Sequence, residues 1–97
     1  MYELVIPTAV SKDVKRFDAP LQRALRDDHF LRLKENPRRG EPLHGSLKGI
    51  WSYHFRFGST QYRIAYEISD EANQVQLVMI GKRGDFYEAL VRRLGLG

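Results

Sequence analysis

The sequence of 97 residues contains no cysteine, so it can form neither a disulfide framework nor a thiolate zinc site, and a reducing compartment is expected. No run approaches the roughly 18 apolar residues of a transmembrane helix, and the N-terminus has none of the features of a signal peptide. The three histidines are scattered, without a cluster of carboxylates beside them, so we expect no metal site and no cofactor. These absences predict a single cytoplasmic domain over residues 1–97 that does not bind membranes.

Acidic residues are scarce in the middle of the chain. The whole sequence has 16 basic and 12 acidic residues, a net charge of +4. Segment 38–65 contains one acid, Glu41, and five basic residues, so five minus one gives +4 for this segment alone. The five basic residues are Arg38, Arg39, Lys48, Arg56 and Arg63. This concentration predicts a surface for phosphates, and the alternative is a basic loop without a ligand.

Hydrophobic periodicity predicts an α+β domain. The helix over 18–36 is expected to be kinked, because its later apolar residues lie off the stripe formed by the early ones. Thr8 or Ser11 is expected to cap the first helix, and Asp85 with Glu88 resembles a capping box. The order β-α-α-β-β-β-α indicates a small, mainly antiparallel sheet with an N-terminal helical hairpin on one face. The expected elements are a strand over 2–6, helices over 8–17 and 18–36, a loop over 37–47, strands over 51–57, 61–68 and 75–80 (the last buried on both faces), and a helix over 86–94.

Residues 51–68 alternate between apolar and polar around a Gly-Ser pair, a pattern typical of an antiparallel hairpin. A two-residue turn places His54 opposite Arg63, and a slip by one residue on each strand places Arg56 opposite Arg63 instead. Both registers leave His54, Arg56 and Arg63 on the polar face, because the apolar face must be buried. Opposed side chains lie about 5 Å apart, so we expect a phosphate between them, or else a solvated face on which the repulsion is screened.

Four segments also carry a family resemblance, in the order EPLHG at 41–45, LKGIWS at 47–52, QYRIAYE at 61–67 and IGKR at 80–83. This ordered pattern is similar to the RelE/ParE superfamily of type II toxin–antitoxin toxins, and it spans nearly the whole chain. The resemblance implies the RelE-like microbial RNase fold. Segment 41–43 is closer to YoeB-like members, whereas segments 11–15 and 42–49 resemble YafQ-like members, so the subfamily stays open.

RelE-like members of the superfamily are ribosome-dependent mRNA endonucleases, so the resemblance implies an mRNA interferase that inhibits translation. Its implied partners are a cognate antitoxin, mRNA in the ribosomal A site, and the ribosome with its rRNA. The catalytic residues implied by the resemblance are His54, Arg56, Arg63, Arg83 and Tyr87, together with Glu41. Further contacts to RNA phosphates are expected at four basic residues, Arg38, Arg39, Lys48 and Lys82.

An RNase that works without a metal needs a base for the ribose 2′-OH, cations for the phosphate and an acid for the leaving 5′-oxygen. His54 is the first candidate base because it titrates near neutral pH, and neighbouring Arg56 and Arg63 are expected to lower its pKa. Glu41 is the second candidate base. Tyr87 is expected to orient the substrate, donate a proton or stack on a nucleobase.

Each of these roles has a structural alternative. Tyr87 can simply cover the last helix, Arg83 can neutralise Asp85, and Glu41 can be an exposed loop acid. Two other functions also fit the pattern. One is a ParE-like poison of DNA gyrase without RNase activity, and the other is a non-catalytic basic module that binds RNA.

Overall fold

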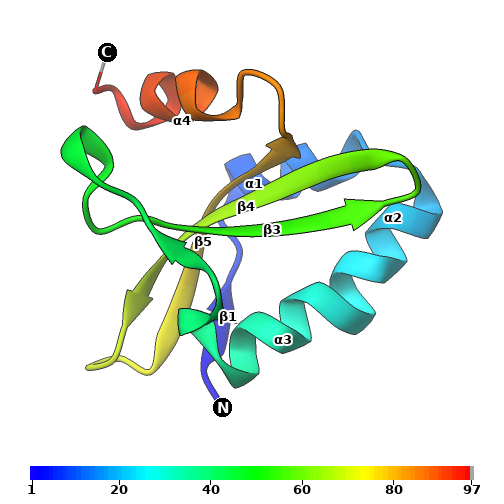
Figure 1. Cartoon of the computed structure of the whole chain (residues 1–97). Helices are drawn as coiled ribbons and strands as arrows, with labels where there is room; N and C mark the ends of the chain where they lie inside the picture. Colours follow the sequence, from blue (N-terminus) through cyan, green and yellow to red (C-terminus); the bar gives the residue numbers. More distant parts are fainter. Residues whose placement is uncertain (97) are drawn as a thin grey trace.

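The computed structural model describes residues 1–96 and has the expected order of elements, with one additional short strand, β2 (Figure 1). Neighbouring strands are antiparallel, except that β1 and β5 are parallel. The strands form one sheet in the order β1-β5-β4-β3-β2, with β1 at Glu3–Val5, β2 at Glu41–Pro42, β3 at Trp51–Phe57, β4 at Thr60–Ser69 and β5 at Gln74–Lys82. The helices are α1 at Thr8–Lys15, α2 at Ala19–Ala24, α3 at Phe30–Glu35 and α4 at Phe86–Leu94. The predicted α+β class is therefore confirmed.

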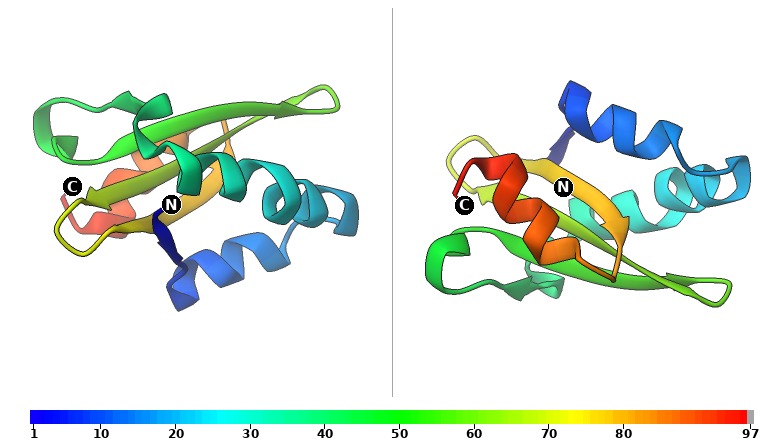
Figure 2. Two further views of the ribbon diagram at one scale, coloured as in Figure 1. Left: turned by 90° about the horizontal axis from the view of Figure 1, so that it is seen from below. Right: turned by 90° about the horizontal axis from the view of Figure 1, so that it is seen from above.

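Helices cover both faces of the sheet. The N-terminal helices α1, α2 and α3 lie on one face, and α4 crosses the other (Figure 2). The larger core, beneath the N-terminal helices, includes Val10, Leu25, Ile64 and Tyr66. A smaller core beneath α4 contains Ile50, Ala65, Met79, Phe86 and Leu90. The helical hairpin therefore packs as expected, and α4 lies on the side of the sheet that the hairpin leaves open.

The expected kink in the second helix is a π-helical turn at Leu25–His29, which joins α2 to α3. The helix begins at Asp18, whose side chain accepts a hydrogen bond from the Leu21 backbone N–H (3.2 Å). A π turn inserts a residue into the helix and so rotates everything after it. Phe30 therefore reaches the core although it lies off the early stripe, while Leu31 stays 41% exposed.

Strand β5 lacks alternation because it contains a bulge. Pairing with β4 steps from Tyr66↔Leu77 to Ala65↔Met79, which leaves Val78 as an extra residue on β5. The extra residue reverses the side-chain parity, so Leu77 faces the larger core and Met79 faces the smaller one. The prediction that this strand is buried on both faces is therefore confirmed.

Three local predictions are wrong. Neither Thr8 nor Ser11 caps α1, because Pro7 occupies the cap position in an extended conformation and its carbonyl accepts the first backbone hydrogen bonds. Asp85 makes no capping box, since it is left-handed (φ 57°) and its side chain makes no cap hydrogen bond. The loop before β3 contains the two-residue strand β2.

Within residues 1–96, no helix has the length and apolar character needed to cross a bilayer.

Candidate active site

The β3–β4 hairpin has the first of the two predicted registers. His54 lies opposite Arg63, and Arg56 lies opposite Gln61. Arg63 shares a face with Ala65, two residues further along β4, and Ala65 packs beneath α4. The polar side of the hairpin is therefore the α4 side of the sheet, and its basic residues lie beside the start of that helix.

Tyr87 reaches from the first turn of α4 over this face. Its hydroxyl oxygen lies 3.4 Å from Ser52 Oγ and 3.5 Å from His54 Nε2. The Arg63 guanidinium carbon lies 4.7 Å from the centre of the Tyr87 ring, in a cation–π contact. Ser52, His54, Arg63 and Tyr87 thus form one group, which we call the His54 cluster. Tyr87 does more than cover α4, and its ring gives Arg63 a contact that holds the guanidinium over the sheet.

Ser52 is the member of the cluster that sequence reasoning missed. It is 1% exposed, and its Oγ lies 3.1 Å from His54 Nε2. The available signal was its position two residues before His54, which places both side chains on the same face of β3. Its contact with Tyr87 had no such signal, because Tyr87 comes from an element 35 residues later in the chain.

The surroundings of His54 lower its pKa below the ordinary value of 6.5. Partial desolvation of the ring is the main cause, because it disfavours the charged imidazolium, and the positive charge of Arg63 adds to it. Glu41 acts in the opposite direction, and Arg83 lowers the pKa slightly further. The direction expected from the sequence is found, but burial outweighs the arginines, and the second arginine that acts is Arg83 rather than the expected Arg56. His54 is therefore mostly neutral, and able to accept a proton, near neutral pH.

Strand β2 brings Glu41 to the same face. Glu41 pairs with Ser52, so both side chains point to the α4 side of the sheet. The preceding Gly40 permits this approach, because a Cβ there would collide with the Tyr66 hydroxyl and lie 2.7 Å from the Ser52 carbonyl oxygen. Tyr66 is fully buried, donates a hydrogen bond to the Pro37 carbonyl (2.6 Å), and has its pKa raised to about 12 by burial. Glu41 is thus held on the sheet rather than on a free loop.

Arg83 follows the end of β5, where its backbone N–H donates to the Gln61 carbonyl (2.9 Å). Within residues 1–96 it forms no ion pair with Asp85, so the simple neutralisation of that acid has no support. Lys82 pairs with Tyr62, whose side chain lies in the larger core, so Lys82 belongs to the opposite face from Arg63. Of these two neighbours, only Arg83 lies close enough to His54 for its charge to lower the His54 pKa.

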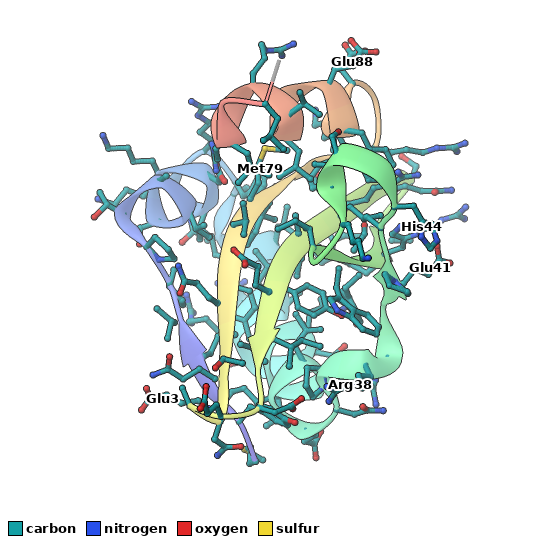
Figure 3. The ribbon with its side chains drawn as sticks, turned by 90° about the vertical axis from the view of Figure 1, so that its left-hand side faces the viewer. Glu3, Arg38, Glu41, His44, Met79 and Glu88 are labelled. Carbon is teal, nitrogen blue, oxygen red and sulfur yellow. The ribbon has the colours of Figure 1, made fainter. Side chains whose placement is uncertain are left out.

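The remaining basic residues lie outside the cluster. Arg38 is paired with Asp70 (2.5 Å), which follows the far end of β4. Asp70 is the seventh residue after Arg63, which corresponds to roughly 23 Å of extended strand. Figure 3 shows Arg38 near the end of the molecule marked by Glu3, whereas Glu41 and His44 lie further toward the end marked by Glu88. Arg39 and Lys48 are exposed between α3 and β3.

The His54 cluster and the neighbouring Glu41 and Arg83 combine groups that handle protons with groups that hold an anion. His54, Glu41 and Tyr87 can accept or donate protons, and Arg63 and Arg83 can neutralise a phosphate. Residues 1–96 contain no group of three His, Cys, Asp or Glu side chains placed to hold a metal ion. The arrangement suits acid–base chemistry on a phosphate ester.

Comparisons with known proteins identify the family of the chain. Residues 4–91 match the family described as the ParE-like toxin of type II bacterial toxin–antitoxin systems. No sequence match was found among curated proteins. A chain of the RelBE2 toxin–antitoxin complex of Mycobacterium tuberculosis is 30% identical, with a TM-score of 0.74 over 87% of this chain and 93% of that one.

Two other solved structures share the fold at lower identity. The isolated RelE toxin of Escherichia coli is 24% identical, with a TM-score of 0.69 over 97% of this chain and 99% of that chain. The archaeal RelE–RelB complex of Pyrococcus horikoshii is 19% identical, with a TM-score of 0.63 over 86% and 96%. The family match, the relative at 30% identity and the common fold agree, and the chain belongs to the RelE/ParE superfamily of type II toxin–antitoxin toxins.

Proposed function

We propose that this toxin is an endoribonuclease that cleaves mRNA in the ribosomal A site and so stops translation in the cytoplasm. The observation that carries this function is the surroundings of His54, which combine a lowered pKa with contacts to Ser52 and Tyr87. Arg63 lies opposite His54 on the neighbouring strand. A neutral imidazole beside a guanidinium is what abstraction of a proton next to a phosphate requires.

In the proposed reaction, His54 takes the proton of the ribose 2′-OH. The 2′-oxygen attacks the neighbouring phosphorus, and the bond from phosphorus to the 5′-oxygen of the next nucleotide breaks. Arg63, Arg56 and Arg83 neutralise the charge that develops on the phosphate. Tyr87 gives its proton to the leaving 5′-oxygen. The products are a 2′,3′-cyclic phosphate and a 5′-hydroxyl, so this step consumes no water.

A cognate antitoxin is also proposed as a partner. Two of the similar structures are complexes of Rel toxins with their antitoxins. The exposed arginines of the active face favour an acidic segment of such an antitoxin, which would compete there with the phosphates of RNA. Co-expression with the neighbouring small gene and co-purification of the two products tests this partnership.

The RNase activity is tested by in vitro translation of a defined mRNA, followed by mapping of new 5′ ends. Wild-type toxin is expected to cut the message only while it is translated. Arg63→Ala is expected to lower the cleavage rate at least about 100-fold, since it removes a cation from the developing charge. Arg38→Ala is the matched control, because Arg38 is already paired with Asp70. Full cleavage by a folded Arg63→Ala variant contradicts the site.

Inhibition of DNA gyrase is the second candidate function, favoured by the match of residues 4–91 to the ParE-like family. It needs none of the proton-transfer groups. A supercoiling assay separates the two, because a gyrase poison stops supercoiling and leaves translated mRNA intact. A toxin that cuts mRNA and leaves gyrase active excludes this alternative.

A further inference from the structure

The hydroxyl group of Ser52 lies between the two residues proposed as base and acid. Its Oγ is 3.1 Å from His54 Nε2 and 3.4 Å from the Tyr87 hydroxyl, whereas those two groups are 3.5 Å apart. The route through Ser52 therefore has two shorter steps in place of one longer step. Because Ser52 is 1% exposed, bulk water does not replace either contact.

A buried hydroxyl must both donate and accept to be satisfied. Within residues 1–96, the side-chain groups at hydrogen-bond distance from Ser52 Oγ are His54 Nε2 and the Tyr87 hydroxyl. Two orientations satisfy all three groups. In one, Tyr87 donates to Ser52 and Ser52 donates to Nε2. In the other, the Nε2 proton goes to Ser52 and Ser52 donates to Tyr87. The two orientations differ only by the transfer of one proton along each hydrogen bond. The row of hydrogen bonds from His54 through Ser52 to Tyr87 can therefore carry a proton from one end to the other.

We propose that Ser52 relays a proton from His54 to Tyr87 during RNA cleavage. This role rests on the proposed endoribonuclease function. The Nδ1 atom of His54 takes the 2′-OH proton while Nε2 gives its proton to Ser52 Oγ. Ser52 passes its own hydroxyl proton to Tyr87, and Tyr87 passes its proton to the leaving 5′-oxygen. One proton enters and one leaves, so the net charge of the cluster does not change. His54 ends with its proton on Nδ1, and exchange with water restores the other tautomer.

Two contacts hold Tyr87 in place for this role. Its ring packs edge-on against Phe86, with the centroids 5.6 Å apart, and its face lies against Arg63. Its hydroxyl therefore stays over Ser52 while the arginine holds the phosphate. Ser52 is a positioning residue in this scheme, since it acts on RNA only through His54 and Tyr87.

The first test measures single-turnover cleavage by Ser52→Ala and Ser52→Thr in the ribosomal assay, with the exposed Ser59→Ala as the matched control. Ser52→Ala is expected to slow cleavage about 10- to 100-fold with ribosome affinity unchanged. Ser52→Thr keeps a hydroxyl and is expected to retain most of the rate. Wild-type speed in Ser52→Ala overturns the relay.

Solvent deuterium gives a readout that a structural role would not change. A relay moves several protons in one step, so the wild-type rate is expected to curve when plotted against the deuterium fraction. Ser52→Ala is expected to give a shallower curve, because the two transfers through Ser52 are lost while those of the 2′-OH and Tyr87 protons remain. Equal curvature in the wild type and in Ser52→Ala overturns the relay. A straight line for the wild type overturns the relay even if the variant fails to fold.

The hydrogen bonds among His54, Ser52 and Tyr87 are tested without RNA. The ¹⁵N chemical shift of His54 Nε2 and the His54 pKa are expected to change in Ser52→Ala and in Tyr87→Phe, and to stay constant in Ser59→Ala. An unchanged ¹⁵N shift and an unchanged His54 pKa in Ser52→Ala and Tyr87→Phe overturn these hydrogen bonds and with them the relay. If the two variants show these changes but the wild-type toxin leaves translated mRNA intact, the proposed function is contradicted instead. The two failures are therefore distinguishable.

Discussion

At the scale of single residues, His54 shows how the fold turns an ordinary side chain into a candidate base. Burial and Arg63 both disfavour its charged form, whereas Glu41 favours it. The lowered pKa keeps the imidazole neutral at pH values where a free histidine is partly protonated. The cleavage rate is therefore expected to rise with pH, with the midpoint of the rise below pH 6.5.

An NMR titration of the His54 ring protons measures this directly. The pKa is expected below 6.5 in the wild type, higher in Arg63→Gln and lower still in Glu41→Gln. The same shift makes stability depend on pH. Because the His54 pKa is higher in the unfolded chain than in the folded one, the unfolded chain binds the proton first. The free energy of unfolding is therefore expected to fall as the pH drops through 6.5. A His54 pKa that does not rise in Arg63→Gln contradicts this account.

The choice between the two candidate bases is also decided at single residues. His54 contacts Tyr87 and Ser52, whereas Glu41 affects His54 only through its charge. His54→Ala is therefore expected to lower the single-turnover cleavage rate by about 100-fold or more, and Glu41→Ala by much less. Rates are compared at saturating toxin, so that weakened binding does not contribute. The reverse order of the two effects assigns the base to Glu41.

At the scale of elements, an ion pair fastens α4 to the rest of the fold. The Arg93 guanidinium donates to both carboxylate oxygens of Asp13 on α1 (2.7 and 2.8 Å) and to the Val78 carbonyl (3.1 Å). Asp13 also accepts from the Ile80 backbone N–H (3.0 Å). Because β1 pairs with β5 only as far as Gln76, this edge of β5 would otherwise be open. The ion pair closes it and joins α1, β5 and α4.

Arg93→Ala is therefore expected to lower the free energy of unfolding by about 3 kcal/mol, since it leaves the buried Asp13 carboxylate without its partner. Urea unfolding followed by circular dichroism measures the change. The matched control is Arg32→Ala, whose pair with Asp28 is exposed and contributes less. Equal losses in the two variants contradict a structural role for the Asp13–Arg93 pair.

The elements also show what the sequence allowed to be predicted. The pairing of His54 with Arg63 follows from alternation and a two-residue turn, both of which are local. The kink in the second helix and the burial of strand 75–80 on both faces were predicted, but their forms, a π turn and a bulge at Val78, were not. Each is an inserted residue that only packing between distant segments makes favourable. Ser52 was missed for the same reason: its role depends on Tyr87, which α4 brings back over the sheet.

At the scale of the whole molecule, the net charge of +4 is less concentrated than segment 38–65 suggested. Arg38 belongs to that segment, yet it pairs with Asp70 at the other end of β4. Arg83 lies outside the segment, yet it is close enough to His54 to lower its pKa. Within residues 1–96, Arg56, Arg63 and Arg83 have no carboxylate within ion-pairing distance. The fold, rather than the order of residues, determines which cations face a phosphate.

This distribution predicts how salt affects RNA binding. Each phosphate contact contributes about 0.7 to the slope of log affinity against log salt concentration for single strands. Arg56→Ala is therefore expected to reduce the slope by about 0.7, whereas Arg38→Ala is expected to leave it unchanged, because Arg38 already has a carboxylate partner. Fluorescence anisotropy of a short labelled RNA, bound to a His54→Ala background that does not cleave, measures the slope. A smaller slope for Arg38→Ala than for Arg56→Ala would move the RNA-binding face from the polar face of the β3–β4 hairpin to the opposite end of the sheet.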